Sequence, residues 1–99
     1  MNDDQEWTMG SYNVFEDLEL PDAKELFMKA NLAVAIHREI KARGLKQVEA
    51  AKLMGIAQPD VSNILRGRLD EFSIERLIRL LDKLDLEVQM SIAPKAKTA

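Results

Sequence analysis

Apolar residues recur at steps of three and four over residues 23–44, which is the pattern of an amphipathic helix. The stripe consists of Leu26, Ala30, Ala33, Ile36 and Ile40. Pro21 and Asp22 precede this segment, and Gly44 can adopt the left-handed conformation that ends a helix. The pattern predicts one long first helix, with His37 beside the apolar stripe as a surface or boundary residue.

A shorter apolar pattern follows over residues 45–68. It predicts a helix over 47–54, a sharp turn at Gly55, and a third helix that has Pro59 at its first position and ends near Gly67. The predicted inward side chains of this unit are Val48, Ala51, Leu53, Ile56, Val61, Ile64 and Leu65. Two short helices around such a turn are typical of a helix-turn-helix unit.

In the last third of the chain the spacing of the apolar residues changes from a helical period to a period of two. Ser73 suits the N-cap of a fourth helix, whose predicted buried stripe is Ile74, Leu77, Ile78, Leu81 and Leu84. Apolar and polar residues then alternate, which predicts a half-buried strand with the apolar positions Leu86, Val88, Met90 and Ile92. We therefore expect an all-α bundle of five helices or fewer, with one C-terminal β-strand.

A single strand leaves its backbone N–H and C=O groups without partners. We expect it to pair with the same strand of a second copy, which would give a two-fold homodimer. The alternative is pairing within the chain to the segment 12–15.

Composition limits the chain to one small domain, since it has 99 residues, 46% of them hydrophobic. It has no cysteine and a single histidine, so we expect no disulfide and no metal site of thiolate or imidazole ligands. We also expect no cofactor and no small-molecule substrate. The longest apolar run has five residues, 32–36, and the N-terminus does not resemble a cleaved signal. A cytoplasmic protein without membrane contact is expected.

Charge is distributed unevenly around the net value of −3. Residues 1–25 hold eight acidic residues and one basic one, which gives −7, whereas the remainder holds thirteen basic and nine acidic residues, which gives +4. The expected organisation is an acidic N-terminal arm over 1–21, a helix-turn-helix domain with its strand over 22–92, and a tail over 93–99. A merely solvated arm is the alternative, and it fits the first ten residues better than the apolar positions that follow.

The third helix is expected to present a polar face. With Val61, Ile64 and Leu65 inward, a rotation of about 100° per residue points the polar side of the helix outward. The outward residues are Pro59, Ser62, Asn63 and Arg66, and Gln58 is exposed because it lies at the tip of the helix. Gln and Asn can pair with adenine, and Arg can pair with guanine or neutralise phosphate, so the face suits double-stranded DNA.

The spacing of several residues resembles that in Cro and cI-type phage repressors, the XRE family, over residues 32–84. The matching positions are Gln47, Glu49, Ala51, Gly55, Gln58, Val61, Ser62, Leu65 and Gly67. The resemblance implies that Gln47 contacts a DNA phosphate and supports Gln58. It also implies that Asn63 contacts a base and that Arg66 and Arg68 face the DNA backbone.

Three positions depart from the family pattern. Pro59 replaces a polar residue that often contacts a base in this family, so fewer side chains of the helix can recognise bases directly. Lys46 and Ala57 stand where the family often has a capping Ser or Thr, so each helix start loses about 1 kcal/mol of capping. Lys46 is expected to contact phosphate instead.

The segments 13–18 and 21–23, together with the closing strand, resemble small antitoxins of the HigA type. That resemblance implies two activities: neutralising a RelE-like, mRNA-cleaving toxin and repressing the antitoxin's own operon. An acidic arm could cover the basic surface of such a toxin. Its predicted anchors are Trp7, Tyr12, Phe15 and Leu18.

Two other functions stay open at this stage. The chain could be a stand-alone XRE-family transcriptional repressor, with the arm as a spacer or a solubility tail. The other alternative is an enzyme that uses Asp82 and Asp85 in hydrolysis, although these residues lie at the end of a packed helix and have no nucleophile near them in the sequence. We expect the chain not to be an enzyme.

Overall fold

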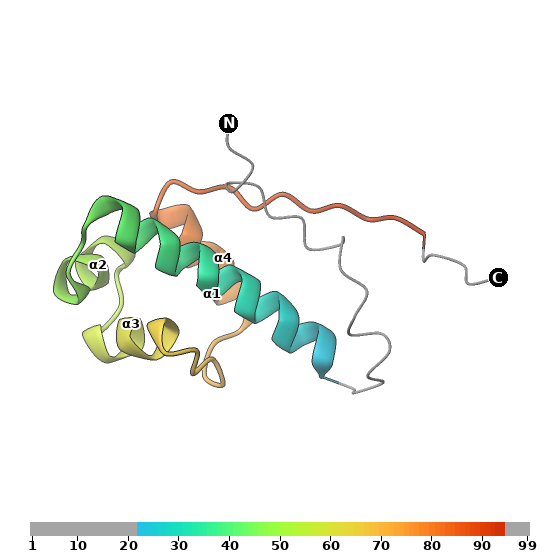
Figure 1. The fold of residues 1–99 in the computed structure, drawn as a ribbon, viewed down its shortest axis with the longest axis horizontal. Helices are drawn as coiled ribbons and strands as arrows, with labels where there is room; N and C mark the ends of the chain where they lie inside the picture. The colour runs from blue at the N-terminus through green and yellow to red at the C-terminus, as the bar shows by residue number, and fades with distance from the viewer. Residues whose placement is uncertain (1–21, 95–99) are drawn as a thin grey trace.

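The computed structural model describes residues 22–94, which contain four helices and no strand (Figure 1). The helices are α1 (Ala23–Arg43), α2 (Gln47–Met54), α3 (Gln58–Leu65) and α4 (Ile74–Lys83). The long α1 packs against α4 and α3, and the short α2 packs against α3 and α4. The prediction of an all-α helix-turn-helix bundle is confirmed for this part of the chain.

The helix ends follow the predicted signals. Gly44 and Gly55 adopt left-handed conformations, with φ of 66° and 72°, and close α1 and α2. At the start of α4, the Ser73 hydroxyl oxygen accepts a hydrogen bond from the Arg76 N–H at 3.0 Å. Helix α3 begins one residue earlier than predicted, so that Pro59 occupies its second position. A missing N–H is equally harmless there, because the first turn has no intrahelical acceptors.

Helices α2 and α3 begin without a side-chain cap from their N-cap residues, Lys46 and Ala57. In α2 the deficit is partly offset, because the Glu49 carboxylate accepts the Lys46 N–H at 2.8 Å. Nothing comparable is observed at Ala57. The expected loss of capping therefore applies most clearly to α3.

The core corrects the predicted orientation of α2. Val48 and Leu53, predicted to point inward, are 51% and 41% exposed, whereas Ala50 and Met54 are 0% and 2% exposed. The true inward face is rotated because small alanines let this short helix approach its neighbours closely. The remaining predicted positions are buried or half-buried against the core: Ala51, Ile56, Val61, Ile64 and Leu65.

The N-terminal half of α1 also differs from its predicted stripe. Leu26 is 55% exposed and Ala30 is exposed, whereas Leu32 is buried. Ala33, Ile36 and Ile40 are buried as predicted. In Figure 1 the first turns of α1 project beyond α2, α3 and α4, so these helices leave one side of them uncovered.

The predicted C-terminal strand is not formed among the described residues. Residues 86–94 follow α4 as an extended segment without ladder partners (Figure 1). Leu86 and Val88 pack partly against the core, but Met90 and Ile92 are 76% and 90% exposed. A strand exists only with a partner, and this single chain offers none to the segment within its described part. Inward and outward side chains alternate over residues 86–89 only, and beyond them every side chain to residue 94 is exposed.

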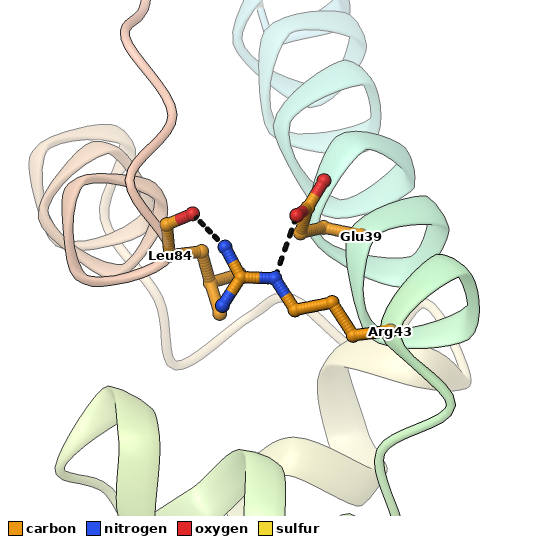
Figure 2. A network of polar contacts seen from close by, with 3 residues as sticks. All are labelled: Glu39, Arg43 and Leu84. Atoms are coloured by element: carbon orange, nitrogen blue, oxygen red, sulfur yellow. Dashed lines mark hydrogen bonds and ion pairs between the residues drawn. The ribbon is translucent and has the colours of Figure 1, made fainter.

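A polar network ties the end of α1 to the end of α4 (Figure 2). The Arg43 Nε donates to the Glu39 carboxylate at 2.7 Å, and its Nη2 donates to the Leu84 carbonyl oxygen. Two helix termini are thereby joined, and an orphan carbonyl at the end of α4 gains a donor. The contact fixes the point from which the segment 86–94 leaves the bundle.

Candidate nucleic-acid interface

Helix α3 is anchored on one side and open on the other. Val61 and Ile64 are 0% and 2% exposed and fix the helix to the core. On the opposite side, Gln58 and Pro59 are exposed and Asn63 is half-buried. Ser62 is also half-buried, and Arg66 is the exposed C-cap residue. The helical rotation predicted for α3 is therefore observed, and the polar side chains lie together on one face.

The remaining predicted DNA-contacting residues flank this face along the chain. Lys46 is exposed and Gln47 is half-buried at the start of α2, which packs directly against α3. Arg68 is exposed just beyond Gly67, whose φ of 78° turns the chain away from α3. We call the eight positions the recognition face: Lys46, Gln47, Gln58, Pro59, Ser62, Asn63, Arg66 and Arg68. Their role in binding DNA remains a prediction.

A contact that sequence patterns did not predict holds α3 in place. Arg76 of α4 forms an ion pair with Asp60 of α3, with 3.3 Å between Nη2 and Oδ2. The same guanidinium lies 4.7 Å from the centre of the Phe72 ring. Phe72 is itself 1% exposed, so the guanidinium packs against a ring that the core holds in position. The pairing joins residues sixteen positions apart, and no local spacing signals it.

Four of the six arginines fall into two groups. Arg43 and Arg76 are held by acidic side chains and, for Arg43, by a backbone carbonyl. Arg66 and Arg68 are exposed and form no ion pair with any residue from 22 to 94. A guanidinium without an internal acidic partner is available to a phosphate, because binding would break no existing contact.

The predicted toxin anchors Trp7, Tyr12, Phe15 and Leu18 lie outside the described residues. The same holds for the arm over 1–21 and for most of the tail over 93–99. Asp82 and Asp85 are exposed at the end of α4. Within the described residues no group of three acidic or imidazole side chains is placed to hold a metal ion. No helix in this part of the chain is long and apolar enough to cross a bilayer.

Comparison with known proteins identifies the fold family. A family model described as a helix-turn-helix domain matches residues 14–93. A solved structure described as an XRE-family transcriptional regulator superposes with a TM-score of 0.73 at 40% sequence identity. The match covers 80% of this chain and 89% of the other.

The chain belongs to the XRE family of helix-turn-helix proteins. This confirms the family resemblance that the spacing of α2 and α3 indicated. No curated protein matches the chain. The narrower resemblance, to HigA-type antitoxins, stays a prediction.

Proposed function

We propose that this XRE-family protein is a DNA-binding transcriptional repressor that reads an operator with α3. The recognition face is the observation that carries the proposal. An α-helix with its side chains is about 10–12 Å across and fits a major groove about 12 Å wide. Gln58, Ser62 and Asn63 supply hydrogen-bonding groups for base edges, and Arg66 and Arg68 supply cations for phosphate.

We further propose that the protein acts as a homodimer joined through the segment 86–92. Met90 and Ile92 are 76% and 90% exposed, and large apolar side chains in adjacent outward positions favour a partner surface. Pairing with the same segment of a second copy would satisfy the backbone and cover both side chains. A two-fold dimer would then present two recognition faces to the half-sites of a near-palindromic operator.

The biological role that we propose is that of an antitoxin in a type II toxin–antitoxin system. In this role the protein represses its own operon and neutralises a RelE-like, mRNA-cleaving toxin. Two features support it: the HigA-type resemblance of the sequence, and an arm over 1–21 with six acidic residues and no basic one. A protein that cleaves RNA needs a basic surface for its substrate, and an acidic segment with aromatic anchors complements such a surface.

If a small basic protein is encoded next to this chain, co-expression of the two tests the antitoxin role. We expect the two proteins to co-purify, and we expect the full chain to stop mRNA cleavage in a translation assay. Deletion of residues 1–20 should abolish neutralisation and preserve operator binding. The matched control exchanges Trp7, Tyr12, Phe15 and Leu18 for serine and keeps every acidic residue.

Loss of neutralisation in the control would assign the binding to the aromatic and aliphatic anchors as well as to charge. Full neutralisation by the truncated chain would contradict the role given to the arm. A chain that represses its operon without any neighbouring toxin would instead be a stand-alone repressor, which is the alternative function.

A further inference from the structure

An open apolar groove lies between α1 and the end of α3. It is formed mainly by Ala30, Val34, His37, Leu65, Gly67 and Leu69. Val34 is 38% exposed and His37 is exposed, whereas Leu69 forms a buried floor. Gly67 lines the groove, and its two chain neighbours, Arg66 and Arg68, are exposed. Apolar and cationic surfaces are therefore adjacent at the edge of the recognition face.

The groove continues along α1 as an apolar stripe. At about 100° per residue, Leu26, Ala30 and Val34 fall within a quarter-turn of the helix surface, and His37 lies between them. Leu26 is 55% exposed, so the stripe begins one turn after the start of α1 and runs toward the groove. An amphipathic helix normally buries such a stripe, and among the described residues its outer edge is uncovered.

We propose that residues 12–20 of the same chain dock on this stripe and groove and thereby screen Arg66 and Arg68 from DNA. The screening part of the proposal rests on the proposed function, whereas the docking part does not. The docked segment would bring Tyr12, Val14, Phe15, Leu18 and Leu20 to the apolar surface.

The attachment point and the length of the segment support this occupant. The arm joins the body at the residue before α1, one turn from Leu26. The stripe from Leu26 to His37 extends about 17 Å at 1.5 Å per residue. Nine residues extend about 30 Å when fully stretched and about 14 Å as a helix. A chain that folds back along α1 therefore reaches the groove without strain.

Charge complementarity also supports it. Glu16, Asp17 and Glu19 alternate with the apolar residues of the segment. Docking in this direction would bring Glu16 and Asp17 toward Arg66 and Arg68, which lack acidic partners among the described residues. Since an intramolecular segment is present at a high effective concentration, even weak docking would compete with phosphate. A partner that captures the arm would then release the recognition face, and the two sites would be coupled.

Paramagnetic relaxation in the full-length protein tests the docking directly. The chain has no cysteine, so Ser11→Cys gives a single attachment site for a nitroxide label. We expect strong broadening of the amide signals of Val34, Leu65 and Leu69, which weakens at high salt. Broadening confined to the first turn of α1 would overturn the proposal. Broadening that appears only between labelled and unlabelled molecules in a mixture would also overturn it, because the occupant would be a second copy.

Two matched variants connect docking to DNA binding. Val34→Asp places a carboxylate in the stripe, and Val48→Asp places the same charge on another exposed valine, in α2 and outside the groove. We expect the first to abolish the broadening at Leu65 and Leu69 and the second to preserve it. Both side chains are exposed, so neither variant should unfold the protein, which a thermal melt will check.

Affinity for a 20-base-pair duplex at low salt gives the second readout. An added negative charge by itself weakens DNA binding, so we expect Val48→Asp to lower the affinity for DNA slightly. We expect Val34→Asp to raise this affinity about fivefold, because the arm no longer competes with DNA for Arg66 and Arg68. A loss in both variants would overturn the screening. If the parent chain bound no DNA, the proposed function would fail, whereas the broadening would still decide the docking.

Discussion

Single residues of the same type have different roles in this protein because their surroundings differ. Arg43 and Arg76 are structural, since each joins two elements through an acidic partner or a carbonyl oxygen. Arg66 and Arg68 point to solvent beside α3 without such a partner among the described residues. A phosphate contact by Arg43 or Arg76 would first have to break these internal contacts. We therefore expect Arg66 and Arg68 to contact phosphate.

The corrected orientation of α2 predicts that truncating one of its apolar side chains lowers stability strongly, whereas truncating another hardly changes it. Met54→Ala should lower the free energy of unfolding by about 2–5 kcal/mol, because a buried side chain leaves a cavity. Val48→Ala should change it by less than about 0.5 kcal/mol, since that side chain is exposed. Urea unfolding followed by circular dichroism measures both. Equal losses in the two variants would mean that the inward face of α2 has been misassigned.

At the level of the helices, the three internal starts differ in their caps. Ser73→Ala should destabilise the protein by about 1 kcal/mol, because the Arg76 N–H loses its acceptor. Ala57→Ser should stabilise it by about 0.5–1 kcal/mol, because Ala57 has the extended backbone of an N-cap but no acceptor of its own. Thermal unfolding of the two variants and the parent chain provides the comparison. An Ala57→Ser variant that melts at the parent temperature would contradict this account of α3.

Helix bounds and the outward face of α3 could be predicted from the sequence because strong local signals define them. Gly44, Gly55 and Ser73 mark helix ends by backbone chemistry, and Val61 with Ile64 fixes the rotation of α3. The rotation of α2 could not be fixed in this way, since eight residues make only about two turns. Bulky Val48 and Leu53 dominated the pattern there, and tertiary packing selected the smaller Ala50 instead.

Contacts between elements that are distant in the sequence could not be predicted from local sequence patterns. The Asp60–Arg76 pair and the Arg43–Leu84 bond connect segments that only the fold brings together. The predicted strand over 86–92 illustrates another limit. Alternation indicates which side chains share a face, but pairing depends on a partner strand that the sequence of one chain does not specify.

For the whole molecule, the proposed dimer predicts that some variants lose dimerisation and still fold. Replacing Met90 and Ile92 with Asp should give a monomer by light scattering, because both side chains lie in the proposed interface. The helical signal should be kept, since neither residue contributes to the core. The matched control is Val34→Asp, which adds charge to an exposed apolar residue elsewhere. A double variant that stays dimeric would exclude the segment 86–92 as the interface.

The dependence of DNA affinity on salt, measured for Arg66→Gln and Asn63→Ala, tests the central claim that the recognition face binds a major groove. The matched control is Arg79→Gln, an exposed arginine of α4 outside that face. We expect Arg66→Gln to weaken binding to all sequences and to reduce the salt slope by about 1 per protomer. Asn63→Ala should relax base preference by about 1–3 kcal/mol at one position, and Arg79→Gln should behave as the parent. Parent-like affinity, slope and base preference in both recognition-face variants would contradict the account.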